Sequence, residues 1–230
     1  EISNIKNISF VPTMGGLHKG HISLIKKSQN FKGKTLVSIF VNPKQFNEKK
    51  DFLNYPRNLK KDLKILKHLN VDLIYLPSLK DIFSFQVKNK IYLDRFSKKL
   101  CGKSRKGHFK GVLNIVNRFL DLIKPKYIIL GIKDFQQSYL ITKHILKRNI
   151  NTKVINCKTV REKNGVACST RNKNLSKNQF RIASKTIRYL KNNKRSIRKK
   201  LSNFNSANIK RNLKNFGVTK IDYIELFNSK

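Results

Sequence analysis

Two histidines have the strongest potential for chemistry in this sequence. His18 and His21 lie three residues apart in the segment VPTMGGLHKGH, directly after two glycines. Residues three apart are neighbours on a helix, so both imidazoles share one face of a first turn. The glycines allow a tight turn, and the helix that follows offers N-terminal amides to an anion. Such a pair can hold phosphate oxygens and stabilise developing charge, although the histidines could also be incidental polar residues.

Two further polar stretches follow predicted strands. In VNPKQF, the neutral amides of Asn42 and Gln45 suit a small substrate with hydroxyl and carboxylate groups, or they serve ordinary turn chemistry. In GIKDFQQ, Lys133 can neutralise a phosphate during its transfer. Asp134 joins it there or caps the next helix, and Gln137 projects from the first helical turn. Both stretches therefore predict recognition of a polar, anionic ligand.

A later segment, VREKNGVACSTRN, supplies Ser169, Thr170 and Arg171. Two hydroxyls and a guanidinium suit the oxygens of a polyphosphate, and the alternative is a polar interdomain loop. Arg105 and His108 in RKGHF stand just before a helix, a position that also favours an anion.

These residues must be positioned by strands and helices that alternate along the chain. Short runs rich in Ile, Val and Leu predict buried parallel strands, and the alternation predicts an α/β fold. We expect a Rossmann-like, doubly wound parallel sheet over residues 1–159, with ligands beyond the carboxyl ends of its strands. The strands are expected at 8–13, 35–42, 72–77, 126–131 and 152–159, and the helices at 18–29, 59–69, 112–123 and 135–146.

The pattern changes after residue 159. Lysine-rich helical segments fill 176–216, and a last strand is possible at 220–227. We expect residues 160–230 to form a smaller, mainly helical C-terminal domain that resembles a lid.

The charge of the chain is extreme, with 52 Lys and Arg against 12 Asp and Glu and a formal net charge of +40. One interpretation is a nucleic-acid binder, because basic residues release counterions from phosphates. The other is a genome rich in A and T, whose codons favour lysine. The excess is mostly lysine and is scattered, whereas nucleic-acid readers rely on arginine. We therefore predict no specific nucleic-acid partner.

Other classes of protein are excluded by composition. The apolar runs are far shorter than the roughly 18 residues of a membrane span, so no membrane association is expected. Three cysteines without a CxxC pair match no zinc site and favour a reducing, cytoplasmic location.

Together these segments resemble the pantoate–β-alanine ligase family, within the HxGH nucleotidyltransferase superfamily. The resemblance implies ATP-dependent condensation of pantoate with β-alanine through pantoyl adenylate, with release of AMP and pyrophosphate. It also implies magnesium with the ATP, a place in pantothenate and coenzyme A biosynthesis, and a homodimer. The matching segments occur in family order: VPTMGGLHKGH, VSIFVNPKQF, YPR, GHFKGV, GIKDFQQ, REKNGVACSTRN and IDYIEL.

The resemblance also implies roles for individual residues. Gln45 and Gln137 clamp pantoate, Asn42 supports that pocket, and Asp62 lies near the magnesium. Four residues, His18, His21, Lys133 and Arg171, have catalytic roles. The ATP-binding set comprises Thr13, Met14, Gly15, His18, His21, Gly131, Lys133, Asp134, Val160, Ser169, Thr170 and Arg171.

The chain departs from the family at a few positions. Cys101 and Ile132 stand where the family usually has glutamate, and Thr170 replaces a serine but keeps its hydroxyl. The chain also ends soon after IDYIEL, so we expect a trimmed C-terminal domain. Alternatives are another HxGH nucleotidyltransferase, a synthetase-like tRNA enzyme, or a basic nucleic-acid-binding descendant of the fold. The pair Gln45 and Gln137 favours the ligase, because those alternatives have no use for it.

Overall fold

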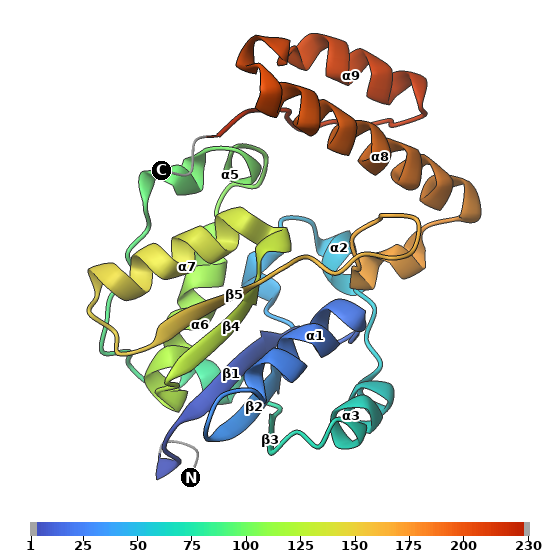
Figure 1. Cartoon of the computed structure of the whole chain (residues 1–230). Helices are drawn as coiled ribbons and strands as arrows, with labels where there is room; N and C mark the ends of the chain where they lie inside the picture. Colours follow the sequence, from blue (N-terminus) through green and yellow to red (C-terminus); the bar gives the residue numbers. More distant parts are fainter. Residues whose placement is uncertain (1–3, 228–230) are drawn as a thin grey trace. The chain divides into compact units, whose positions relative to one another are not determined.

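The structure is a computed structural model that describes residues 4–227. Internal contacts divide the chain into two compact units, Glu1–Val160 and Arg161–Lys230. The first unit contains a parallel sheet with its helices, and the second is helical (Figure 1). The division falls one residue after the boundary expected from the change in sequence pattern.

The sheet of the first unit has five strands in the described residues, in the order β3-β2-β1-β4-β5. Every neighbouring pair is parallel, with Val11 opposite Val37 and Phe10 opposite Ile128. All five strands were expected from their apolar runs, and the predicted fold class is confirmed. The strands are β1 Ile8–Thr13, β2 Lys34–Ile39, β3 Leu73–Tyr75, β4 Tyr127–Gly131 and β5 Lys153–Cys157.

Helices connect these strands and continue into the second unit. Those of the first unit are α1 Lys19–Ser28, α2 Lys49–Leu53, α3 Leu59–His68, α4 Leu79–Phe83, α5 Cys101–Ser104, α6 His108–Ile123 and α7 Phe135–Lys147. Those of the second are α8 Lys177–Lys199 and α9 Ser206–Asn215. Short 3-10 turns are η2 Pro43–Gln45, η3 Arg95–Lys98, η4 Ile132–Asp134, η5 Thr170–Asn174 and η6 Leu201–Asn203.

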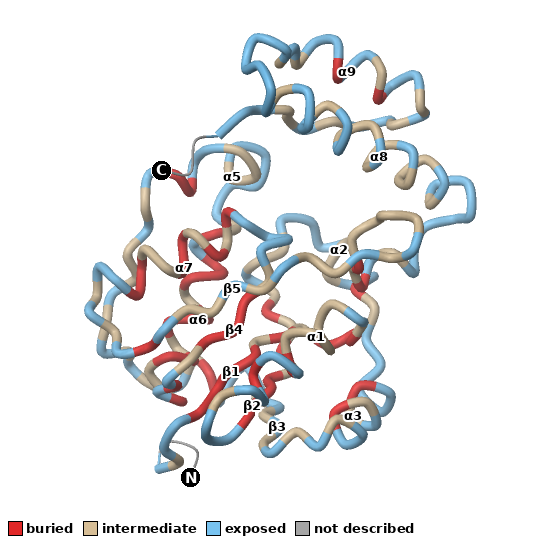
Figure 2. Tube along the Cα trace, viewed as in Figure 1, coloured by how far each residue is buried: buried red, intermediate tan, exposed pale blue. Residues whose placement is uncertain are grey.

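Both faces of the sheet are covered, because successive residues of a strand point to opposite sides. Phe10 and Ile128 pack in a core with buried residues of α4, α6 and α7. Val11 and Ile129 belong to a second core with residues of α1 and α3. Figure 2 shows the buried positions concentrated along β1, β4, α6 and α7. The sheet is therefore doubly wound.

The strand order creates a crevice where ligands bind in folds of this kind. β2 and β3 lie on one side of β1, whereas β4 and β5 lie on the other. The order of the chain therefore reverses between β1 and β4, and ligands bind beyond the carboxyl ends at such a point. The segments after β1, β2 and β4 begin at this edge.

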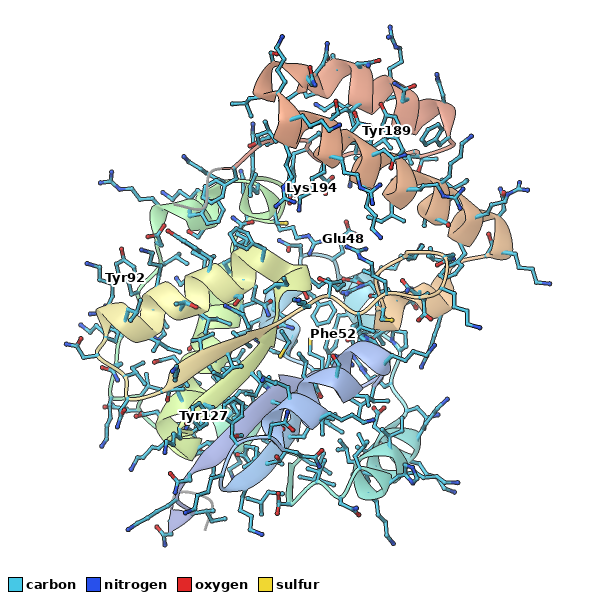
Figure 3. The ribbon with its side chains drawn as sticks, in the orientation of Figure 1. Glu48, Phe52, Tyr92, Tyr127, Tyr189 and Lys194 are labelled. Atoms are coloured by element: carbon cyan, nitrogen blue, oxygen red, sulfur yellow. The ribbon has the colours of Figure 1, made fainter. Side chains whose placement is uncertain are left out.

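The second unit is built on two packed helices. Ile209 and Leu213 of α9 are buried, and Tyr189 of α8 packs edge to face against Phe216 with ring centroids 5.3 Å apart (Figure 3). The strand predicted at 220–227 is wrong, because those residues contain no strand. A strand needs a partner for its backbone groups. The β pairing described in this unit is a single bridge, Arg161–Ala167.

Candidate active site

The turn after β1 is fixed by its own hydrogen bonds. The Thr13 hydroxyl donates to the Ser38 carbonyl at 2.7 Å and accepts from the Gly15 amide at 3.2 Å. Gly15 and Gly16 have φ of +76° and +61°, values that residues with a Cβ rarely adopt. The two glycines are therefore required by the conformation of the turn, as the sequence indicated.

Asp62 of α3 holds this turn from the side. Its buried carboxylate accepts hydrogen bonds from the amides of Gly16 at 2.7 Å and Leu17 at 2.8 Å. These amides belong to the turn and not to the helix that was expected to offer its amides to an anion, and they face a carboxylate of the protein itself. A Cβ at Gly15 would lie 3.0 Å from Oδ2 of Asp62, so the carboxylate also packs closely against the backbone of Gly15. The geometry gives Asp62 the role of positioning the turn.

The described residues show no cluster of three or more His, Cys, Asp or Glu side chains that could hold a metal ion. Asp62 was expected near magnesium, yet each of its oxygens already accepts a backbone amide. This donor set does not fit a resident metal site.

His18 starts helix α1 and fixes its own tautomer. Its Nδ1 accepts from the Gly20 amide at 3.0 Å, so the side chain caps the helix. Because Nδ1 is the acceptor, the neutral ring carries its proton on Nε2. The ring stacks on that of His21 with centroids 4.0 Å apart, which confirms the shared face predicted from their spacing.

His21 is held in its neutral form. Burial is the main cause that lowers its pKa from 6.5 to about 3, and the Coulombic interactions with His18 and Lys133 contribute to the same shift. Its Nδ1 is buried and has no hydrogen-bond partner among the described residues. A neutral imidazole in this position suits hydrogen bonding to an anionic ligand, without the charge of an imidazolium.

The segment after β4 brings a lysine to the same edge of the sheet. Gly131 ends β4, and Lys133 and Asp134 follow in η4 with their Nζ and Oδ2 atoms 3.5 Å apart. The charge of Lys133 also lowers the pKa of His21 and so favours the neutral imidazole. Gln137 stands in the first turn of α7. Val160 lies after β5, at the last position of the first unit.

Asn42 and Gln45, after β2, have different roles in the structure. Asn42 is buried, its Oδ1 accepts from the Lys44 amide at 3.1 Å, and its Nδ2 donates to the Gly111 carbonyl at 3.2 Å. Its side chain therefore supports η2. The Gln45 amide instead donates to the sulfur of Met14. This contact joins a residue expected to bind pantoate to one expected to bind ATP.

The start of α6 forms a platform under η2, which we define as His108 and Gly111. A Cβ at Gly111 would lie 2.3 Å from the Lys44 carbonyl oxygen, so only glycine allows this approach. His108 Nδ1 donates to the Gln45 carbonyl at 2.7 Å. The platform was not predicted from the sequence, where His108 was expected to favour an anion. Gly111 directly precedes the helix predicted at 112–123, and only the structure places it inside α6, where a glycine costs stability unless packing requires it.

Gln136 was also missed. Its Nε2 donates to the carbonyls of Phe96 at 2.8 Å and Lys99 at 2.7 Å, and its Oε1 accepts from the Cys101 amide at 3.1 Å. The side chain is therefore fully used in holding the segment before α6. Of the two adjacent glutamines, Gln136 is structural and Gln137 remains the candidate for substrate.

The second unit carries the remaining predicted residues. Ser169 caps η5 by accepting from the Arg171 amide at 3.4 Å, while Thr170 is buried and Arg171 is exposed. The preceding turn is tied to α8 by a hydrogen bond of 2.8 Å from the Ser184 hydroxyl to the Asn164 carbonyl. Three neighbouring residues thus include one cap, one buried hydroxyl and one exposed guanidinium.

Known proteins resemble the chain over nearly its whole length. The family model described as Pantoate-beta-alanine ligase matches residues 1–230. Pantothenate synthetase of Francisella tularensis subsp. novicida is 41% identical over 230 residues, covering 98% of this chain and 83% of that protein. The enzyme of Pseudothermotoga lettingae is 38% identical over 229 residues, covering 98% and 81%.

Solved structures show the same relationship. A crystal structure of pantoate-beta-alanine ligase from Francisella tularensis, complexed with beta-gamma ATP and beta-alanine, has a TM-score of 0.84 and 40% identity, covering 98% of this chain and 84% of that one. Pantothenate synthetase from Thermus thermophilus has a TM-score of 0.80 and 30% identity, covering 92% and 76%. Fold, sequence and the order of the polar segments agree, and the chain belongs to the pantoate–β-alanine ligase family.

Proposed function

We propose that the protein condenses pantoate with β-alanine at the expense of ATP. The pantoate carboxylate attacks the α-phosphorus of ATP, which forms pantoyl adenylate and releases pyrophosphate. The amine of β-alanine then attacks the acyl carbon, so that pantothenate and AMP leave. Neither step needs a nucleophile from the protein, so catalysis consists of positioning and of stabilising charge.

One observation carries this proposal. His18 and His21 stack beside a turn that Asp62 holds, and Lys133 interacts electrostatically with His21. We assign the two imidazoles and the ammonium group to the phosphates of ATP, where negative charge builds up as pyrophosphate departs. Because His21 is neutral, it contributes a hydrogen bond and Lys133 contributes the positive charge.

The amide side chains define the acid substrate. Gln45 and Gln137 are assigned to the hydroxyl and carboxylate oxygens of pantoate, and Asn42 supports Gln45 through η2. The contact of Gln45 with Met14 supports this assignment, because it sets the amide beside the turn that leads to the histidines. The carboxylate would then start close to the α-phosphate.

The remaining nucleotide contacts are assigned to several segments. Thr13, Gly15, Gly131 and Asp134 border the turns after β1 and β4, and Val160 follows β5. In the second unit Ser169, Thr170 and Arg171 supply hydroxyls and a guanidinium for polyphosphate oxygens. Magnesium enters with ATP and neutralises its phosphates.

The proposal is tested by following AMP and pyrophosphate with purified protein. ATP, pantoate and β-alanine together should give AMP, and pyrophosphate release should depend on pantoate. In His21→Ala, pyrophosphate release should fall by a factor on the order of 100, as expected when one transition-state donor is lost. His68→Ala, which changes an exposed histidine of α3, is the matched control and should keep full activity.

Other outcomes would identify the alternatives. AMP formation that needs neither acid nor amine would indicate a different nucleotidyltransferase, and a requirement for tRNA would indicate a synthetase-like enzyme. Full activity of His21→Ala with an unchanged fold would overturn the assigned role.

We also propose a homodimer that works in the cytoplasm, as the resemblance implies. Cys101, Cys157 and Cys168 are thiols that form no disulfide within the described residues, which suits a reducing compartment. No helix in the described part of the chain is long and apolar enough to cross a membrane. Light scattering on a sizing column measures the mass, and a monomer at micromolar concentration would contradict the dimer.

A further inference from the structure

The basic charge of the second unit differs in kind from that of the first. The stretch 163–221 holds 17 Lys and Arg residues and not one Asp or Glu. Arg161–Lys230 contains 7 arginines to 12 lysines, whereas Glu1–Val160 contains 5 arginines to 28 lysines. A codon bias that favours lysine accounts for the excess of lysine over arginine in the first unit. It does not account for arginines collected in the second.

Helix geometry arranges these charges in a line. At 100° per residue, six exposed residues of α8 fall within an arc of about 80°, and together they run about 33 Å along the helix. Lys191 lies in the widest gap between them, roughly 40° to one side. We call this set the basic stripe: Lys177, Arg181, Lys185, Arg188, Arg195 and Lys199.

The stripe is unfavourable for the isolated helix. Lys177 with Arg181, Arg181 with Lys185, and Arg195 with Lys199 are like charges four residues apart, a spacing that destabilises a helix. Since no acidic residue exists in α8 or α9, no neighbour on these helices compensates. An external polyanion would remove this repulsion.

The apolar residues of α8 contact other parts of the second unit. Tyr189 packs on Phe216, and a Cβ at Gly217 would lie 3.0 Å from Ile182, so these residues are half-buried rather than exposed. A helix that binds a membrane surface needs an open apolar face beside its basic residues. Figure 3 shows nitrogen-tipped side chains projecting from α8 and α9. The available surface is therefore polar and cationic.

We propose that the basic stripe of α8 binds the phosphodiester backbone of nucleic acid without reading its sequence. Arginine and lysine at intervals of about 4.5 to 6 Å along the helix, with one wider gap of about 10.5 Å between Arg188 and Arg195, suit a polymer whose phosphates repeat along its length. A long stripe of one sign exceeds what a mononucleotide can contact. This activity is separate from ligation, and it is compatible with the expectation of no specific nucleic-acid partner.

The test uses the full-length protein and a labelled single-stranded RNA of about 20 nucleotides, with a DNA duplex of the same length as the second probe. One variant carries Arg181→Gln, Arg188→Gln, Arg195→Gln and Lys199→Gln. The matched control carries Lys60→Gln, Lys61→Gln, Lys64→Gln and Lys67→Gln, four exposed lysines of α3, so both lose the same charge. Fluorescence anisotropy at several salt concentrations gives Kd.

The stripe variant should bind RNA at least tenfold more weakly, while the control changes less than about twofold. The slope of log K against log salt should fall by about 2 to 3 for the RNA if the four side chains each release a counterion. Pantothenate formation should stay unchanged in both variants, which also shows that they fold. Failure of ligation in the wild-type protein would concern the proposed function alone.

Three results would overturn the proposal. An equal loss of affinity for RNA in the two variants would mean that the net charge of the protein, and not the basic stripe, attracts RNA. Binding of neither the RNA nor the DNA duplex by the wild-type protein at about 0.15 M salt would also overturn it. Stripe-dependent binding to anionic vesicles without binding to RNA would assign the surface to membranes. Stripe-dependent binding of the DNA duplex but not of the RNA would support the proposal and identify DNA as the nucleic acid that is bound.

Discussion

Two turns at the carboxyl edge of the sheet are held in opposite ways. The turn after β1 is held by charge, since the Asp62 carboxylate accepts the amides of Gly16 and Leu17. The turn after β2 is held by shape, since Gly111 lets the backbone of α6 approach the Lys44 carbonyl. Both supports come from helices distant in sequence. Each turn presents side chains to a different substrate in the proposed reaction.

The difference predicts which substitutions each turn tolerates. A turn held by a carboxylate fails when the charge is removed, because its amides are then left without acceptors. A turn held by close approach fails when a methyl group is added, because the backbones must separate. Two single-residue changes can therefore disturb ATP chemistry and pantoate recognition independently.

The largest effect is expected from Asp62→Ala. It leaves two buried amides unsatisfied, and each such group costs about 1–3 kcal/mol. The free energy of unfolding should fall by about 3 kcal/mol, and pyrophosphate release by a factor on the order of 100. Urea denaturation and the pantoate-dependent assay measure these changes.

Asp121→Ala provides the matched control for Asp62. Asp121 accepts one hydrogen bond from the Lys88 amide, at 2.8 Å, and that bond is exposed. Its loss should lower stability slightly and leave turnover unchanged. Normal turnover in Asp62→Ala would mean that the turn after β1 keeps its shape without the carboxylate.

A smaller and more selective effect is expected from Gly111→Ala. The new methyl group would push η2 away from α6, and overpacking of this kind costs about 1–3 kcal/mol. The KM for pantoate should rise about tenfold, while the KM for ATP changes less than about twofold. Steady-state kinetics with each substrate varied in turn separates the two.

Gly33→Ala tests whether such a shift is specific. A Cβ at Gly33 would lie 1.9 Å from the Asn7 carbonyl oxygen, so the strain is comparable, but it falls before β2 at the amino end of the sheet. Stability should drop with both KM values unchanged. An equal rise of the two KM values in Gly111→Ala would argue against a platform for pantoate alone.

A third, weaker effect concerns His108. His108→Ala removes the hydrogen bond to the Gln45 carbonyl, a loss of about 1 kcal/mol, so the KM for pantoate should rise roughly fivefold. His108→Asn can place an amide N–H near the position of Nδ1 and should restore most of the affinity. If Asn fails to rescue, the ring itself rather than its hydrogen bond supports the turn.

The strands and the main helices of the first unit could be predicted because their signal is local. Continuous apolar runs and helical spacing reflect burial, and burial decides these elements. The strand predicted at 220–227 failed because the segment has no partner strand in the described part of the second unit. A local pattern can propose a strand but cannot supply the neighbour that completes it.

The site was only partly predictable for a related reason. The pairing of His18 with His21 follows from spacing on one helix, and the structure confirms it. The partners of Asp62 and Gly111 lie 46 and 67 residues away in the chain, and no local pattern reports such contacts. Gln136 and Gln137 are chemically identical in sequence, and helix phase within the fold decides that Gln136 points inward.

The smallest expected effect is an absence of change, and it tests the electrostatics of the turn after β1. Because the pKa of His21 is lowered to about 3, its NMR signal should not shift between pH 8 and pH 5. In urea, where the chain is unfolded, all five histidines should titrate near 6.5. Below pH 6.5 the unfolded chain binds a proton at His21 that the folded chain does not bind. The contribution of neutral His21 to stability is therefore fully present above pH 6.5. It is lost as the pH falls from 6.5 towards 3. A His21 signal that titrates near 6.5 in the folded protein would show that the ring is solvated. In that case this histidine, as well as Lys133, would supply positive charge to the phosphates of ATP.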